Sequence, residues 1–276
     1  MRKRTCAISV AALLWFALPS PCAWAQVQTP NWGGYEVLGA DFNVVNANWT
    51  VPKVAYAQYP SHPPRESSAV WVGIGGAARS HRTDSTLIQA GTWQNVDSSN
   101  TESYSAWYEM LPDPPVRLTK CVGDVSCTVK PGDIMYVIIE LKNPKQNPNL
   151  WLIVVQNLNK NIMGKPIWVF SKTVTYHSSQ RSAEWIVEAT NSTTAGHYLP
   201  LPNSDPVLFQ YIQAGKLNTG PFPQSYTLAA NGDLLVDPWG GKMRPCAEKA
   251  HSIGTYVDVY GNFYVVPGET NCLAAP

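Results

Sequence analysis

Apolar and polar residues alternate with a period of two through most of this chain of 276 residues, and no long stretch has the 3.6-residue period of a capped helix. The alternating stretches are rich in Val, Ile, Thr, Tyr and Trp, which favour extended backbone. Pro, Gly, Asn and Asp fill the breaks between them. The pattern predicts strands at Trp32–Leu38, Val44–Val51, Ser68–Ile74, Thr86–Gln94, Tyr104–Leu111, Ile134–Lys142, Leu150–Asn157, Ile167–Thr175 and Ala183–Glu188.

Many short strands separated by turns predict an all-β fold, either an antiparallel β-sandwich or a barrel. From about Pro221 onward turn signals become dense, and only short strands are expected, at Leu234–Val236, Tyr256–Val259 and Phe263–Val266. We therefore expect a main domain over residues 26–220 and a C-terminal annex over residues 221–276 that packs on this domain or continues it.

The first 25 residues resemble a secretory signal peptide, with a basic start, a short apolar run and a small-residue cleavage site at Arg2–Arg4, Cys6–Leu18 and Ala23–Ala25. Its removal would leave 17 Lys and Arg against 19 Asp and Glu. This balance, without a basic patch, gives no indication of nucleic acid, and no later segment is long and apolar enough to cross a membrane. We expect a monomer that is secreted, or periplasmic in a bacterium.

Four cysteines follow the expected signal: Cys121, Cys127, Cys246 and Cys272. An even number in an exported chain predicts two disulfides, for which three pairings are possible. We favour Cys121–Cys127 and Cys246–Cys272, since each closes a local loop. A zinc site is the competing interpretation, but the chain has neither a C-x-x-C motif nor paired histidine spacing, and we expect no metal and no cofactor.

Three predicted strands carry polar side chains among apolar ones. In the first strand, alternation places Gln89 on the same face as Leu87 and Trp93. In the second, Trp107 shares a face with Glu109, and in the third, Glu184 shares a face with Ile186 and Glu188. Each group alone is typical of a solvated face, because antiparallel sheets commonly expose one side to water. Together the carboxylates, the amide and the indole suit a substrate cleft.

Seven sequence blocks resemble the glutamic peptidases (eqolisins), a family of secreted acid endopeptidases. They are NWGGY at Asn31–Tyr35, NWTVP at Asn48–Pro52, WVGIGG at Trp71–Gly76, LIQAG at Leu87–Gly91, YSAWYEMLP at Tyr104–Pro112, KPGD at Lys130–Asp133 and AEWIVE at Ala183–Glu188. The blocks occur in the family's order over about residues 31–215, and their combination is specific. The resemblance implies an antiparallel sandwich of two sheets, lectin- or glucanase-like, and a protein or peptide substrate.

The resemblance also implies a catalytic dyad, with the family's glutamine at Gln89 and its glutamate at Glu184. An ionised glutamate can take a proton from water and return it to the leaving nitrogen, while an amide donates to the oxyanion. A pKa near ~4.3 for an unperturbed glutamate suits mild acid. Since the chain has no D-T-G or D-S-G triplet, we expect no inhibition by pepstatin.

The neighbouring block implies substrate-binding residues at Trp107, Glu109 and Tyr104. Glu188 is expected at the rim of the cleft or in support of it. The choice of Glu184 over Glu188 rests on the resemblance, because a period of two treats these residues alike.

The chain departs from the family at position 75, where Gly75 replaces the common aspartate of the W-x-G-I-D-G block. Only Gln26 to Pro30 separate the expected signal from the first block, so we do not expect a long propeptide. Two other functions stay open. One is a non-catalytic, lectin-like module that binds peptide or carbohydrate. The other is a retaining glycosidase, although Glu184 and Glu188 would be about 13 Å apart along a strand, against the ~5–5.5 Å that such enzymes need; Glu109 with Glu184 is a second possible pair.

Overall fold

The computed structural model describes residues 27–29, 31–39, 41–57, 64–78, 82–162, 165–166, 168–191, 198–215, 232–236, 242–247 and 261–267. The expected signal peptide, the expected strand at Tyr256–Val259 and Cys272 lie outside these residues. In the part of the chain that is described, no helix is long and apolar enough to cross a membrane.

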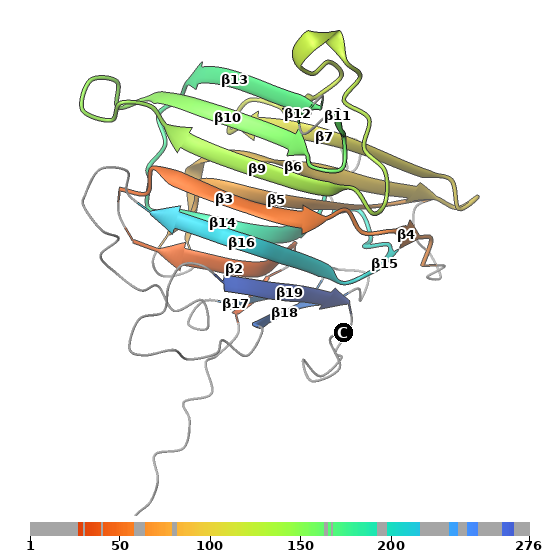
Figure 1. Cartoon of the computed structure of the whole chain (residues 1–276). Helices are drawn as coiled ribbons and strands as arrows, with labels where there is room; N and C mark the ends of the chain where they lie inside the picture. Colours follow the sequence, from red (N-terminus) through yellow and green to blue (C-terminus); the bar gives the residue numbers. More distant parts are fainter. Residues whose placement is uncertain are drawn as a thin grey trace, which may run out of the picture.

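The described residues form two layers of antiparallel strands, which confirms the predicted β-sandwich (Figure 1). We call the layers the front sheet and the rear sheet. The front sheet has the order β13 (Val169–Thr175), β10 (Leu150–Asn157), β9 (Ile134–Leu141), β3 (Val44–Thr50) and β16 (Val207–Gly215). The rear sheet has the order β2 (Trp32–Leu38), β14 (Ser182–Ala189), β5 (Arg65–Ala78), β6 (Arg82–Asp97), β7 (Glu102–Met110) and β8 (Val116–Arg117).

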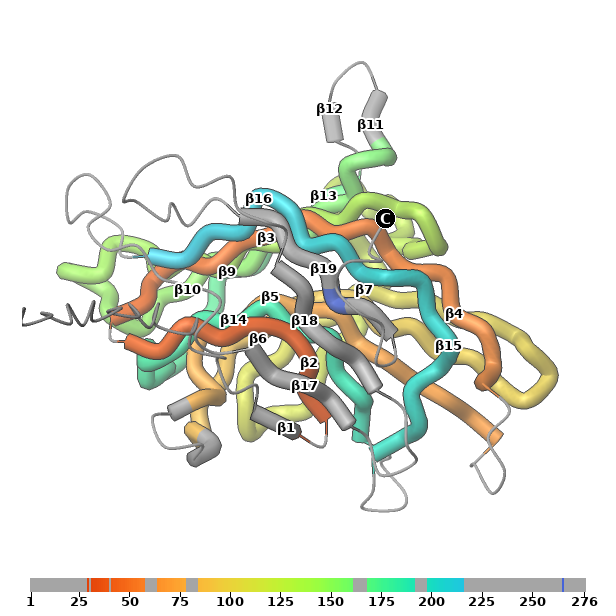
Figure 2. The backbone as a smooth tube through the Cα atoms, turned by 90° about the horizontal axis from the view of Figure 1, so that it is seen from below, coloured from red at the N-terminus to blue at the C-terminus, as the bar shows by residue number. Residues whose placement is uncertain are grey.

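Figure 2 shows the two layers from below, with β3 and β16 in one layer and β2 and β14 in the other. Three strands near the C-terminus join the two sheets along one edge (Figure 1). They are β19 (Gly261–Pro267), β18 (Lys242–Ala247) and β17 (Gly232–Val236). β19 pairs with β16 of the front sheet and β17 pairs with β2 of the rear sheet, while β1 (Val27–Thr29) lies parallel to β17. Residues from the expected annex thus continue the hydrogen bonding of both sheets. The division of the chain at residue 220 stays a prediction.

The main core lies between the sheets and contains the inward face of β14. Ala183, Trp185 and Val187 are all buried there, as their alternation predicts. Buried indoles also connect the sheets by hydrogen bonds. Trp49 donates to the Thr92 hydroxyl (3.2 Å), and Trp185 donates to a backbone carbonyl of β3 (2.9 Å). These contacts fix β14 and β6, so the opposite faces of the two strands have a rigid support.

Most predicted strands are present within a few residues of their expected ends, but β16 was not predicted. A bulge interrupts its pairing with both neighbours between Phe209 and Gln213. At this bulge Tyr211 has a positive φ of 50° and an exposed ring. The bulge breaks the period-two pattern on which the prediction depended. Smaller elements are the pair β4 (Val54–Ala55) with β15 (Asn203–Ser204), the pair β11 (Asn161–Ile162) with β12 (Lys165–Pro166), and the 3₁₀ turn η1 (Val122–Asp124).

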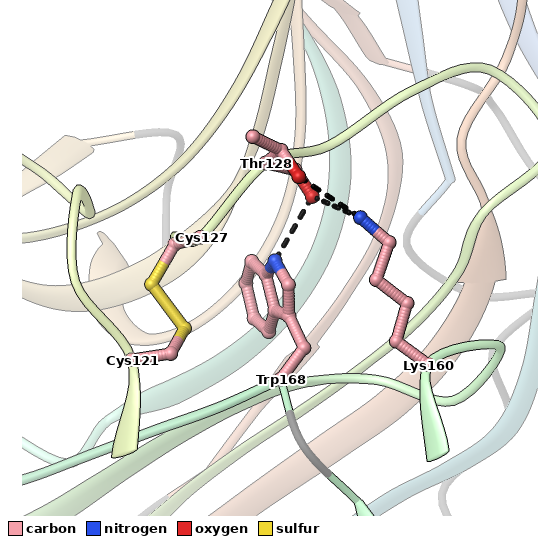
Figure 3. The surroundings of a disulfide bond; sticks show 5 residues. All are labelled: Cys121, Cys127, Thr128, Lys160 and Trp168. Carbon is pink, nitrogen blue, oxygen red and sulfur yellow. Dashed lines mark hydrogen bonds between the residues drawn. A yellow bond between two sulfur atoms is a disulfide. The ribbon is translucent and has the colours of Figure 1, made fainter. Parts of the chain in front are cut away.

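One of the two expected disulfides is present, between Cys121 and Cys127, around η1 (Figure 3). The next residue, Thr128, connects this loop to the core. Its carbonyl accepts hydrogen bonds from the buried Trp168 indole (2.9 Å) and from Lys160 Nζ (3.0 Å). The disulfide Cys246–Cys272 stays a prediction, because Cys272 lies outside the described residues.

Candidate active site

The outward face of the rear sheet gathers the polar residues that the sequence singled out. Strand pairing aligns five residues in one row across β2, β14, β5, β6 and β7: Glu36, Glu184, Gly73, Gln89 and Glu109. Residues in such a row point to the same side of a sheet. Four residues further along β14, Glu188 points to this side as well.

Aromatic side chains surround the Glu188 end of this face. Trp32 meets Trp71 edge to face, with ring centroids 5.0 Å apart, and Trp93 stacks on Trp107 at 5.1 Å. These rings belong to a second apolar cluster, separate from the main core, that also includes Ile186 and Leu87. Aromatic walls of this kind exclude water and strengthen the electrostatic interactions beside them.

Gln89 and Glu109 are joined by a short hydrogen bond. Gln89 Nε2 donates to Glu109 Oε2 at 2.6 Å, and Gln89 is only 4% exposed. Burial raises the pKa of Glu109, and the hydrogen bond from Gln89 offsets part of that rise. The carbonyl oxygen of Gln89 is buried and has no partner among the described residues. The amide therefore has one acceptor and one N–H not used by this bond.

Glu188 is held by donors from two neighbouring positions. The Trp71 indole donates to Oε2 at 2.7 Å, the Asn31 amide donates to Oε1 at 3.3 Å, and the nearby Trp32 also lowers the pKa of this carboxyl group. Burial raises the pKa of Glu188 to about 7, and the charge of Glu109 adds to the rise, against the effect of the donors. The side chain keeps part of its surface exposed. Glu188 is thus oriented, accessible and within electrostatic reach of the Gln89–Glu109 pair.

Glu184 has different surroundings. It is completely buried, and neither carboxylate oxygen has a hydrogen-bond partner among the described residues. Gly73 lies between it and Gln89 in the row. Burial raises its pKa well above the ordinary value, and the charges that add to the rise come from Glu36 and Asp84. The structure therefore does not bring the expected base, Glu184, into the hydrogen-bonded group around Gln89.

Of the expected substrate-binding residues, Trp107 and Glu109 face the site but Tyr104 does not. Alternation along β7 turns Tyr104 to the opposite side, where its ring packs against the main core. Its hydroxyl donates to Glu102 (2.6 Å) and accepts from the Val54 amide (3.2 Å). This is a structural role, so the structure corrects the placement of Tyr104 in the cleft.

The backbone at Gly75 explains why an aspartate is not accommodated at this position. Gly75 has a positive φ of 89° and lies at an irregularity in the pairing of β5 with β6. A Cβ atom there would lie 2.3 Å from the carbonyl oxygen of Thr86. The hydrogen bonds that an aspartate could supply are therefore absent from this chain, and the site depends on other groups.

Two contributions were missed by sequence reasoning. Asn31 and Trp71 donate to Glu188, yet neither was singled out, because donors on different strands leave no signal in the spacing of one strand. The block WVGIGG did place Trp71 on the same alternating face as Gly73. Within the described ranges no group of three or more His, Cys, Asp or Glu residues could hold a metal ion. The described groups offer proton transfer and hydrogen bonding, through a carboxyl group and an amide.

Two comparisons by sequence found proteins that are similar to this chain. The model of the Peptidase A4 family matches residues 30–231. Aspergillopepsin-2 of Aspergillus niger is 26% identical over 173 residues, which cover 57% of this chain and 55% of that protein. The chain thus spans about half the length of this relative.

Two solved structures share the fold. Scytalido-glutamic peptidase, solved with a transition-state-analogue inhibitor, superposes with a TM-score of 0.59 at 17% identity, covering 86% of this chain and 97% of that one. SCP-B, a member of the eqolisin family solved with the tripeptide Ala-Ile-His, gives 0.51 at 17% identity, with coverage of 86% and 97%. At this identity the two superpositions show the fold alone.

Proposed function

The chain belongs to the peptidase A4 family, the glutamic peptidases, and from this premise we propose that it is an exported endopeptidase that hydrolyses peptide bonds with Glu188 and Gln89. We assign the role of the base to Glu188 instead of Glu184, which the resemblance implied. The observation that carries the proposal is the convergence of Trp71 and Asn31 on Glu188, a carboxyl group on which the charge of Glu109, the hydrogen-bond partner of Gln89, also acts.

The proposed reaction needs one proton acceptor and one oxyanion donor. Ionised Glu188 takes a proton from the water that attacks the scissile carbonyl carbon, and a C–O bond forms. Gln89 donates its second N–H to the carbonyl oxygen as negative charge develops there, while Glu109 holds the first N–H. Glu188 then gives its proton to the leaving nitrogen as the C–N bond breaks, which restores the ionised carboxylate.

The raised pKa of Glu188 changes the expected pH range. A base works only while it is ionised, and burial raises the pKa of this group to about 7. The activity should therefore lie in weak acid rather than in strong acid. No step uses a pair of aspartates, so pepstatin should not inhibit the enzyme.

The substrate should be an extended peptide. The aromatic pairs Trp32–Trp71 and Trp93–Trp107 offer broad apolar walls on either side of the polar group. The related SCP-B was solved with a tripeptide. The signal-like N-terminus supports export of the enzyme.

The test is cleavage of a denatured protein at pH 3, 5 and 7 with pepstatin present, for the wild type, Gln89→Ala and Glu188→Gln. Asn95→Ala, on the same strand as Gln89, is the matched control. We expect cleavage by the wild type and the control, and a loss of at least about a hundredfold in both site variants. Circular dichroism checks that each variant is folded.

Absence of cleavage by the folded wild type at every pH would overturn the proposal and favour the binding module. Retention of activity in folded Glu188→Gln would remove this residue from the reaction. Cleavage blocked by pepstatin would contradict a mechanism without an aspartate pair.

A further inference from the structure

Glu184 is a buried ionisable group that the proposed reaction does not use. Its side chain is 0% exposed, and both carboxylate oxygens are without a hydrogen-bond partner in the part of the chain that is described. Its direct neighbour across the β2–β14 pairing is another glutamate, Glu36. Side chains of residues that face each other in an antiparallel pair have Cβ atoms only about 5 Å apart.

The charges with the largest effect on Glu184 are negative. Among the side chains that the structure describes, they are those of Glu36 on β2 and Asp84 on β6. Asp84 accepts from the amide and hydroxyl of Thr86, and Arg181, which is exposed, acts on Asp84. On β5 the neighbour is Gly73, which has no side chain.

The nearest donors to Glu184 are already engaged with each other. The Ser182 hydroxyl donates to the Ala77 carbonyl at 3.0 Å and accepts from the Ala77 amide at 3.3 Å. Both groups lie close enough to favour the ionised form of Glu184 slightly, but burial outweighs them. A buried ionised carboxylate beside a second one, without a cation, is strongly unfavourable. A proton bound between the two glutamates removes this penalty and supplies the missing hydrogen bond.

We propose that Glu184 and Glu36 form a carboxyl pair that folds with at least one bound proton, and that loss of this proton at higher pH loosens β2 from β14 and disables the site around Glu188. The regulatory part rests on the proposed function. The carboxyl pair itself does not, because it concerns only the stability of the fold.

The fold connects the pair directly to the site. β14 pairs with β2 from Ser182 to Glu188, so both glutamates of β14 share this partner strand. At the far end of β2, Trp32 packs against Trp71, and the adjacent Asn31 donates to Glu188. Separation of β2 would therefore remove two of the contacts that orient Glu188.

The direction of the pH effect follows from linkage. Burial raises the pKa of Glu36 to about 7, and it also raises that of Glu184 well above the ordinary value of 4.5. The folded protein then binds protons that the unfolded chain has released. Stability is highest below about pH 4.5 and falls as the pH rises through 7, with the folding constant decreasing roughly tenfold per pH unit for each such proton.

The experiment is urea unfolding of the mature protein at pH 4, 5, 6, 7 and 8, followed by tryptophan fluorescence. The variants are Glu184→Gln, Glu36→Gln and the double variant. Glu140→Gln on the outward face of the front sheet is the matched control. A second readout is peptidase activity at pH 5 after incubation at pH 8.

We expect Glu184→Gln to resemble the wild type at pH 4 but to exceed its folding constant at least tenfold at pH 7, since a neutral amide replaces the protonated acid. Glu36→Gln should do the same, and the double variant should gain little more, because the two groups act as one pair. Both single variants should keep more activity than the wild type after incubation at pH 8.

A pH dependence of stability in Glu184→Gln equal to that of the wild type and of Glu140→Gln would overturn the pair. So would fully additive effects in the double variant. If Glu184→Gln does not fold, Glu36→Gln provides the same comparison from the more exposed partner. Failure of the proposed function would appear instead as inactivity at every pH, with the urea results unchanged.

Discussion

The two ends of the outward face of β14 place identical residues in opposite environments. Glu188 receives hydrogen bonds from Trp71 and Asn31 and keeps access to solvent. Glu184 has no partner among the described residues, no solvent access and two acidic neighbours. The pKa is raised by burial at both ends, but of the two carboxyl groups only that of Glu188 accepts hydrogen bonds from described residues, and these stabilise its ionised form. Donors, rather than burial or the glutamate itself, distinguish a group suited to transfer protons from one suited to retain them.

The largest expected effect is on the pH dependence of kcat/KM in the wild type, which reports the pKa of the base. Since burial raises the pKa of Glu188 to about 7, kcat/KM should fall roughly tenfold per pH unit below that value, or about a hundredfold from pH 6 to pH 4. Initial rates on a fluorogenic peptide measure it. A maximum near pH 3 would show that the base has an ordinary or lowered pKa, which contradicts the assignment to Glu188.

Removing a hydrogen-bond donor from Glu188 should make the environment of its carboxyl group more like that of Glu184. In Trp71→Phe the ring stays but the N–H that stabilises the ionised form is lost, so the pKa of Glu188 rises further. We expect the acidic limb of the profile to move up by about one pH unit, with up to a tenfold loss of activity on that limb. Trp151→Phe, whose indole donates to Tyr176 in the core, is the control. An unchanged limb would mean that the indole does not act on the base.

Removing the negative charge of Glu109 should lower the pKa of Glu188, by less than the loss of the Trp71 donor raises it. In Glu109→Gln the charge that raises the pKa of Glu188 is gone, while the amide can still accept from Gln89. The acidic limb should move to lower pH by less than one unit, with plateau activity within a few-fold. A shift to higher pH would contradict repulsion between the two carboxylates.

Substitution of Gly75 should have the smallest effect on the catalytic rate, but a clear effect on the stability of the fold. Gly75→Asp introduces a Cβ that clashes with the Thr86 carbonyl, so unfolding should become easier by at least about 2 kcal/mol. Gly132→Asp is the matched control, since Gly132 also has a positive φ but an added Cβ meets nothing within 4 Å. Equal losses in the two variants, measured by urea at pH 5, would mean that φ strain alone matters.

The sequence predicted the sandwich because inward faces such as Ala183, Trp185 and Val187 alternate without interruption. It missed β16 because the bulge at Tyr211 breaks that alternation. The candidate site was predicted in part. Gln89, Trp107 and Glu109 face it, whereas Tyr104 has the wrong parity along β7. A period of two could not separate Glu184 from Glu188, since the difference lies in donors outside β14, namely Trp71 on β5 and Asn31 next to β2.

Which glutamate of β14 acts as the base is decided by kcat/KM of Glu188→Gln and Glu184→Gln, measured side by side at pH 5 on the same peptide. We expect a loss of at least about a hundredfold in Glu188→Gln. Glu184→Gln should keep activity within about threefold of the wild type, since an amide replaces a protonated acid of the same shape. The reverse result, with Glu184→Gln inactive and Glu188→Gln active while both are folded, would return the base to Glu184.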